Sequence, residues 1–186
     1  KSPASEVYAE IDVNLVMFSK DAPYRDSVLE EIIQRLPHKI SNFVLINNAA
    51  EQILKSVAEI QWLDWENSLA VNTVAPFFLV QGLIKELIEA RGHVINISSI
   101  HAKLTKTKFT CYGASKAALE AVTRSLALEL SPLGISVNAV APAAISTKML
   151  KASFKDKPEK LRELESYHPS RGIGAPAQVA LFVKTI

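Results

Sequence analysis

The sequence has 186 residues, of which 48% are hydrophobic, and its 21 basic and 19 acidic side chains give a formal net charge of +2. A chain of this length can bury a substantial core, and we expect a single domain over residues 1–186. The charges are balanced and interspersed, which is not the pattern of a protein that binds nucleic acid or an anionic membrane surface.

The first third of the chain alternates apolar runs with an amphipathic segment. Residues 13–18 are apolar enough to predict a strand, and residues 26–36 have the pattern of an amphipathic helix that Pro37 ends. Residues 43–46 form a second short apolar run, typical of a buried strand. This order predicts one strand-helix-strand unit at the start of the chain.

The middle of the chain repeats the alternation with longer helices. Residues 64–90 have helical periodicity, and the Arg-Gly pair that follows is a helix stop. The run from Gly92 to Ile97 is apolar and β-branched, as in a parallel strand buried on both faces. A long helix is then expected over residues 110–130.

The last third adds one more strand and two helical segments. Residues 135–140 read as a strand, residues 151–166 as a charged helical stretch, and Pro176 as the first turn of a last helix. Repeated strand-helix alternation favours a parallel sheet with right-handed crossovers. The fold class expected is therefore α/β, a doubly wound, Rossmann-like parallel sheet.

Tyr112 and Lys116 are the side chains in this pattern with the clearest chemical meaning. They are four residues apart on the long helix, so they share one face. A neighbouring ammonium favours the phenolate, which predicts a lowered pKa for Tyr112 and a role in acid-base catalysis. The spacing is common by chance, however, and taken alone it fits a solvated helix face better.

Two further polar residues favour the catalytic interpretation of Tyr112 and Lys116 over a solvated helix face. Ser99 lies thirteen residues before Tyr112 and follows the predicted strand that ends at Ile97. Ligands of open α/β sheets bind at the carboxyl ends of strands, so Ser99 and Tyr112 can meet there. Asn72 lies within the helical segment, four residues before Pro76. Proline has no N–H to give the Asn72 carbonyl, which predicts a kink and a place for a water molecule.

At this point the chain resembles the short-chain dehydrogenase/reductase family, Tyr-x-x-x-Lys type, over roughly residues 40–183. The segment 47–50, Asn-Asn-Ala-Ala, is similar to the family's Asn-Asn-Ala-Gly after its fourth strand. The segment 137–147 is similar to its sixth strand and the Pro-Gly-x-x-x-Thr that follows. The family's catalytic tetrad is matched in order and spacing by Asn72, Ser99, Tyr112 and Lys116.

The resemblance implies an oxidoreductase that interconverts an alcohol and a carbonyl with NAD or NADP. Tyr112 would be the general acid or base, Ser99 would orient the substrate oxygen, and Lys116 would lower the Tyr112 pKa and hold the nicotinamide ribose. Asn72 would hold a water through its carbonyl. The positions that would contact the cofactor are Asn48, Ala49, Tyr112, Lys116, Pro142, Ile145 and Thr147. For Thr147, capping a following helix is an equally good interpretation.

One part of the family pattern is missing from these residues. The family's glycine-rich phosphate loop stands near its N-terminus, whereas the first glycine here is Gly82. Either the sequence is a fragment, incomplete at both ends, or the protein has lost the loop and is a catalytically silent binding or assembly subunit. We expect the fragment, because the catalytic positions are intact. Ala50 and Ala143 replace family glycines and could narrow the nicotinamide pocket.

The remaining expectations concern partners and location. A small carbonyl or alcohol is the expected substrate, and no metal, nucleic acid or membrane is expected. An Ala/Leu stripe on the long helix (Ala117, Ala121, Leu128) suggests a homodimer or homotetramer, with core burial as the alternative. Cys111 is the only cysteine, so no intrachain disulfide can form. Together with a polar start that lacks a signal-peptide pattern, this predicts a cytoplasmic protein.

Overall fold

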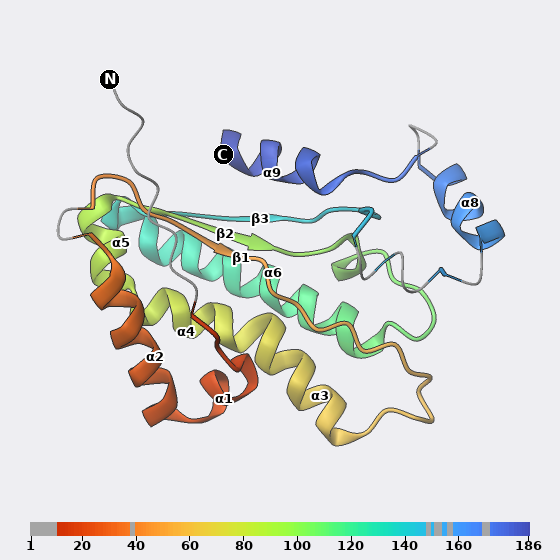
Figure 1. Cartoon of the computed structure of the whole chain (residues 1–186), viewed down its shortest axis with the longest axis horizontal. Coiled ribbons are helices and arrows are strands. Elements are labelled where there is room, and N and C mark those ends of the chain that lie inside the picture. Colours follow the sequence, from red (N-terminus) through yellow and green to blue (C-terminus); the bar gives the residue numbers. More distant parts are fainter. Residues whose placement is uncertain (1–10, 38–39, 148–149, 151–153, 156–157, 169–171) are drawn as a thin grey trace.

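The computed structural model describes residues 11–37, 40–147, 150, 154–155, 158–168 and 172–186. Its centre is a parallel sheet of three strands in the order β1-β2-β3 (Figure 1). The strands are β1 (Val44–Asn47), β2 (His93–Ile97) and β3 (Ser136–Val140). Each of these strands was predicted from its apolar, β-branched run, and the parallel pairing confirms the α/β Rossmann-like class.

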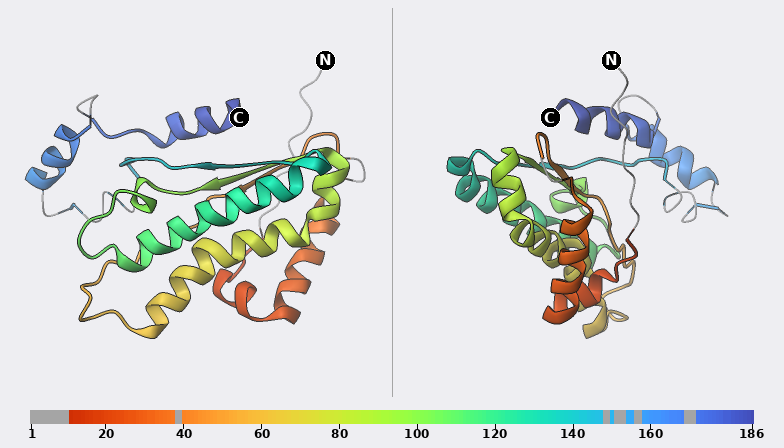
Figure 2. Two further views of the ribbon diagram at one scale, coloured as in Figure 1. Left: turned by 180° about the vertical axis from the view of Figure 1, so that it is seen from behind. Right: turned by 60° about the vertical axis from the view of Figure 1, so that its left-hand side comes forward.

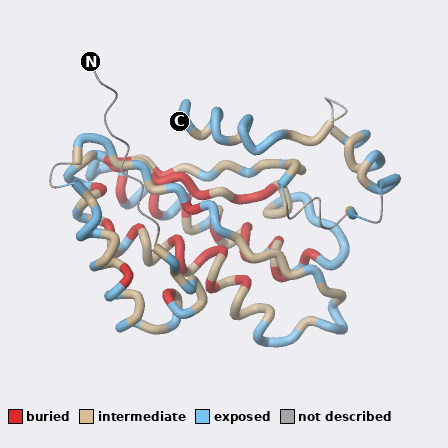
Figure 3. The backbone as a smooth tube through the Cα atoms, viewed as in Figure 1, coloured by how far each residue is buried: buried red, intermediate tan, exposed pale blue. Residues whose placement is uncertain are grey.

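Four helices from the middle of the chain lie on one side of the sheet. These are α3 (Trp62–Leu69), α4 (Ala75–Gly82), α5 (Ile84–Ala90) and the long α6 (Thr110–Leu130), which packs directly on β2 and β3. Figure 2 shows α4 and α6 running under the strands, and Figure 3 shows the buried residues gathered between these layers. The main core cluster consists of Val80, Leu83, Leu87, Val94, Leu126, Leu130, Ile135 and Val137. Because this core fixes α6 against β2 and β3, it also fixes the side chains that α6 carries.

Two further helices follow the sheet in the chain. They are α8 (Pro158–Ser166) and α9 (Pro176–Thr185), and α9 lies on the other side of the sheet from α6 (Figures 1 and 2). Pro176 stands at the first turn of α9, as predicted. The predicted helical stretch 151–166 is confirmed from Pro158 onward, and part of its beginning lies outside the described residues. Helices on both faces agree with a doubly wound sheet.

The strand predicted over residues 13–18 is wrong, because this segment belongs to α1 (Leu15–Lys20). The Asn14 side chain caps the helix by accepting hydrogen bonds from the N–H groups of Val16 and Met17, each at 3.1 Å. Phe18 is fully buried against the start of α4. A short apolar run does not distinguish strand from helix, and here the polar cap decides. The helix α2 (Ala22–Arg35) follows directly, close to the predicted bounds.

Pro76 shapes the long helical segment differently from the prediction. Between α3 and α4 the chain forms one π-helical turn, Ala70–Val74, in which the Ala75 N–H donates to the Ala70 carbonyl. The helix widens here and does not kink. The bend of 63° lies later, at the break between α4 and α5. Single π turns of this kind occur frequently at functional sites.

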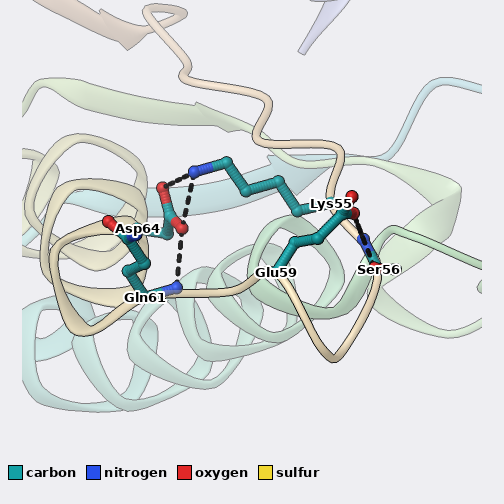
Figure 4. A network of polar contacts seen from close by, with 5 residues as sticks. All are labelled: Lys55, Ser56, Glu59, Gln61 and Asp64. Atoms are coloured by element: carbon teal, nitrogen blue, oxygen red, sulfur yellow. Dashed lines mark hydrogen bonds and ion pairs between the residues drawn. The ribbon is translucent and has the colours of Figure 1, made fainter.

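The loop between β1 and α3 is held by a small polar network (Figure 4). Lys55 donates to both carboxylate oxygens of Asp64, at 2.8 and 2.9 Å. Asp64 also accepts from the Gln61 N–H, and Glu59 accepts from both the N–H and the hydroxyl of Ser56. The hydrogen bonds from Lys55 and Gln61 lower the pKa of Asp64. The network fixes the start of α3 and the loop that follows β1.

In the described part of the chain, no single helix is long and apolar enough to cross a membrane. The bent pair Trp62–Gly82 and Ile84–Ala90 meets that test only when its two parts are counted together. Three of its residues, Val80, Leu83 and Leu87, are buried in the main core cluster.

Candidate active site

The carboxyl ends of the three strands lie at one edge of the sheet. In the parallel register Asn47 pairs with Asn96, and Ile97 pairs with Val140. Beyond the strands, the Ile100 N–H donates to the Pro142 carbonyl at 3.1 Å, so the segments after β2 and β3 stay together. The predicted site residues Asn48, Ser99 and Pro142 therefore all follow strand ends at this edge, where ligands of such sheets bind.

Ser99 has two hydrogen-bonding roles at this edge. Its Oγ accepts from the His101 N–H at 3.2 Å, which caps the short 3-10 helix Ile100–Ala102. Its hydroxyl is also hydrogen-bonded to the Tyr112 phenol. The capping interpretation is thus confirmed, and the structure brings Ser99 and Tyr112 together as the spacing predicted, while the catalytic role of Ser99 stays a prediction.

Tyr112 has a raised pKa, which is the opposite of the sequence prediction. Burial raises the pKa because it disfavours the phenolate, and the hydrogen bond from Ser99 only partly opposes this shift. The expected lowering by the Lys116 charge is not among the causes. In this structure Tyr112 therefore holds its proton at neutral pH and is suited to donate it.

Lys116 is deeply buried at the centre of the site. Its side chain is 2% exposed, and its Nζ donates to the Ile97 carbonyl at 2.7 Å. The Nζ lies 5.9 Å from the centroid of the Tyr112 ring. Burial lowers the pKa of Lys116 to about 8. An ammonium has three donors, and Ile97 takes one. The predicted role of the remaining two donors, to hold the nicotinamide ribose, stays a prediction.

Asn72 acts through its side chain in this structure. Its Oδ1 accepts from the Glu51 N–H, and its Nδ2 donates to the Glu51 carbonyl, both at 2.8 Å. The same Nδ2 donates to the Ser115 hydroxyl at 2.9 Å. The prediction gave the functional role to the backbone carbonyl of Asn72. In the structure it is the side-chain amide of Asn72 that connects the π turn to the loop after β1 and to α6.

The other predicted cofactor positions follow β1 and β3 at the same edge of the sheet. Asn48 and Ala49 are exposed, and Ile145 forms an isolated parallel bridge with Gly174. The Oγ1 of Thr147 accepts from the Leu150 N–H at 3.2 Å, which satisfies the capping interpretation. Nothing in these contacts assigns the residues to a ligand, so their cofactor role stays a prediction.

The two alanines in place of family glycines do not strain the backbone. Among the described non-glycine residues, only Arg91 and Lys108 have a positive φ. Ala50 and Ala143 therefore adopt conformations that any residue can take. Their methyl groups add bulk, but they require no change in the path of the chain.

Sequence reasoning missed two residues that contact this site. Phe109 packs beside Tyr112 and His101, with ring centroids 6.0 and 4.3 Å away. Ser115 is fully buried and accepts from Asn72. Both are next to recognised features, at the start of α6 and directly before Lys116. Only their polar or aromatic character pointed to them, and that signal is too common to use alone.

Other parts of the described chain offer no competing centre. No group of three or more His, Cys, Asp or Glu side chains lies close enough there to hold a metal ion. A cleft of about 270 Å³ lies between α6 and β3, lined by Lys103, Glu120 and Arg124 among others. Ser99, Tyr112 and Lys116 do not line this cleft, so it is not part of the candidate active site.

Comparison with known proteins identifies the family. The model of the family described as short chain dehydrogenase matches residues 2–158. The chain belongs to the short-chain dehydrogenase family. The matched range includes Asn72, Ser99, Tyr112 and Lys116, whose catalytic roles stay predictions.

Individual relatives agree with this assignment. A glucose and ribitol dehydrogenase homolog of Oryza sativa subsp. japonica is 38% identical over 145 residues, which cover 74% of this chain and 48% of that protein. The chloroplastic NADPH-dependent aldehyde reductase 1 of Arabidopsis thaliana is 39% identical over 138 residues, covering 74% of this chain and 47% of that one. The chain thus spans about half the length of these relatives.

A solved structure shows the same fold. It is a proposed NAD(P)-dependent gluconate 5-dehydrogenase from Beutenbergia cavernae with bound NADP. The TM-score is 0.77 at 26% identity, and the match covers 89% of this chain and 64% of that chain. The short-chain dehydrogenase described here therefore contains the larger part of that fold.

Proposed function

We propose that this short-chain dehydrogenase is an NAD(P)-dependent oxidoreductase that interconverts an alcohol and a carbonyl compound. The observation that carries the proposal is the grouping of Ser99, Tyr112 and Lys116 at one sheet edge. Ser99 is hydrogen-bonded to the Tyr112 phenol, and the Lys116 ammonium lies 5.9 Å from the centroid of the phenol ring. A protonated phenol beside a hydroxyl is suited to bind and protonate a carbonyl oxygen.

Each residue then has a defined task. Tyr112 donates its proton to the carbonyl oxygen, and Ser99 hydrogen-bonds that oxygen and orients it. Lys116 offers its two remaining donors to the ribose hydroxyls and stabilises negative charge near the phenol. Asn72 holds the loop after β1, which carries Asn48 and Ala49. When bound, the nicotinamide supplies or accepts the hydride.

The relatives guide the choice of substrate. One is a glucose and ribitol dehydrogenase homolog, another an NADPH-dependent aldehyde reductase. We therefore propose a small aldehyde, ketone or polyol. The test is to add a panel of small hydroxylated aldehydes and ketones with NADPH or NADH and to follow the nicotinamide absorbance. Carbonyl-dependent loss of the reduced cofactor supports the proposal. Saturable cofactor binding without turnover of any substrate favours the silent binding subunit.

The raised pKa of Tyr112 predicts different pH profiles for the two directions. Reduction uses the protonated phenol, which is present at neutral pH, whereas alcohol oxidation uses the phenolate. We expect kcat/KM for oxidation to rise about tenfold per pH unit between roughly pH 6 and 8, below the range in which Lys116 loses its charge, because the phenolate fraction rises in that proportion. Reduction should show no such rise. Initial rates in both directions test this, and a flat oxidation profile would contradict the assignment of Tyr112.

We also propose that the protein is a homodimer or homotetramer that pairs through α6. Core burial of the Ala/Leu stripe is not what the structure shows, since Leu128 is 81% exposed and Ala121 is exposed as well. Trp62, 76% exposed on α3, adds further apolar surface. Sedimentation of the protein tests the proposal, and a monomer at micromolar concentration would contradict it. The cytoplasmic location stays a prediction.

A further inference from the structure

The Ser115 hydroxyl is the most completely bonded side chain near the proposed catalytic residues. It donates to the Tyr112 carbonyl at 2.9 Å and accepts from Asn72 Nδ2 at 2.9 Å and from the Ser68 hydroxyl at 3.2 Å. A hydroxyl has one donor and two acceptor sites, so its capacity is filled. Ser68, Asn72 and Ser115 are all fully buried. No water competes for these bonds, which makes them costly to break.

These bonds join three parts of the fold. Asn72 is bound on its other side to the backbone of Glu51, in the loop that carries Asn48 and Ala49. Thr73, the next residue in the π turn, donates its hydroxyl to the Ser115 carbonyl at 2.9 Å. A continuous path therefore runs from the loop after β1, through the π turn, to the first turns of α6.

Ser115 lies on α6 between the two proposed catalytic residues of that helix, so the hydrogen bonds that hold Ser115 also affect their positions. It stands between Tyr112, whose carbonyl it binds, and Lys116, the next residue. Lys116 must reach the Ile97 carbonyl, 2.7 Å from its Nζ, and Tyr112 must meet Ser99. Both contacts depend on how α6 sits against β2, and Ser115 is the buried polar residue of α6 that holds this end of the helix to α3 and the π turn.

We propose that Ser115 is a positioning residue, which holds the first turns of α6 so that Tyr112 and Lys116 stay buried and aligned with Ser99 and Ile97. This inference rests on the proposed function for its catalytic meaning. What it says about structure, that Ser115 keeps Tyr112 and Lys116 buried and aligned, does not depend on whether the protein turns over a substrate. The two can therefore be tested separately.

The test is to titrate Tyr112 and Lys116 by NMR in protein labelled with carbon-13 at tyrosine and lysine side chains. In Ser115→Ala, water is expected to reach both groups. The pKa of Lys116 should then rise from about 8 by about one unit or more toward the value of a free lysine, near 10.4. The pKa of Tyr112 should fall toward about 10. Loss of global stability alone would not move these values while the protein is folded.

Three variants control the experiment. Ser68→Ala removes only the longest bond to Ser115 and should shift both pKa values less than Ser115→Ala does. Ser115→Thr keeps the hydroxyl and should restore them. If Ser115→Ala does not fold, Ser115→Cys, which weakens the same bonds, takes its place with the same expectation. Unchanged pKa values in a folded Ser115→Ala or Ser115→Cys variant would overturn the proposal.

The kinetic arm links the proposal to activity. In Ser115→Ala, kcat for carbonyl reduction should fall about tenfold or more with little change in KM, because alignment and not substrate binding is lost. Ser115→Thr should recover most of the rate. If the wild type has no activity, the proposed function fails while the titration still decides the role of Ser115. If kcat is unaffected by the alanine, the positioning role is contradicted.

Discussion

Replacement of Tyr112 by phenylalanine is expected to lower kcat for carbonyl reduction by about 10²- to 10⁴-fold, the usual range for loss of a general acid. The variant removes one hydroxyl and leaves the ring that packs against Phe109 and His101. The reduced nicotinamide can still bind, but no side chain then delivers a proton to the developing alkoxide. Ser99 loses its phenol partner and can hydrogen-bond the substrate without protonating it.

Steady-state kinetics of the variant with NADPH or NADH measure this effect. The matched control is Tyr167→Phe, since Tyr167 is 72% exposed on the segment after α8 and its phenol donates to the Glu163 carboxylate, far from Ser99 in the sequence. That control should retain wild-type rates. A Tyr112→Phe variant that retains more than about a tenth of the wild-type kcat would assign proton donation to another group.

Lys116 is expected to make the free energy of unfolding depend on pH. Its pKa is lowered to about 8 in the folded protein by burial, whereas an unfolded lysine has a pKa near 10.4. Between these values the unfolded state binds more protons than the folded state, so stability rises with pH. Below about pH 8 both states carry the charge, and the fold bears the cost of burying it. The shift corresponds to about 3 kcal/mol over this window.

The variant Lys116→Met isolates this contribution. It keeps an unbranched side chain of similar length but cannot ionise, so its stability should lack the rise. Denaturant unfolding of both proteins at pH 7.5 and at pH 10 gives the difference, and the wild type should gain about 2 kcal/mol relative to the variant, because pH 10 still lies below the unfolded pKa. Loss of the hydrogen bond to Ile97 shifts the variant equally at both pH values. A parallel change with pH in the two proteins would contradict a buried, charged Lys116.

Much of the fold could be predicted from the sequence because its central elements have strong local signals. The strands β1, β2 and β3 are apolar and β-branched, and the ends of β1 and β2 coincide with the polar residues Asn47 and Ser98. The long helix α6 has the predicted bounds, Thr110–Leu130. The meeting of Ser99 and Tyr112 followed from the general rule that strand ends and the next helix form the site.

The remaining features depend on contacts that are distant in the sequence. The segment 13–18 is apolar like a strand, and it became helical because Asn14 caps it and Phe18 packs against α4. The pKa of Tyr112 was predicted in the wrong direction, because the depth of burial cannot be read from a four-residue spacing. The π turn at Asn72, and the bonds that Ser115 makes to it, arise only when α3 and α6 are packed together.

The central claim is that Tyr112, Ser99 and Lys116 form the proton-transfer site of a nicotinamide-dependent oxidoreductase. It is tested most directly with NADPH or NADH deuterated at the nicotinamide C4, incubated with a small hydroxylated aldehyde or ketone, with the alcohol analysed by mass spectrometry. The wild type should place one deuterium on the former carbonyl carbon, and Tyr112→Phe should give little or no labelled alcohol in the same time. Equal labelling by both proteins, or none by a wild type that binds the cofactor, would contradict the claim.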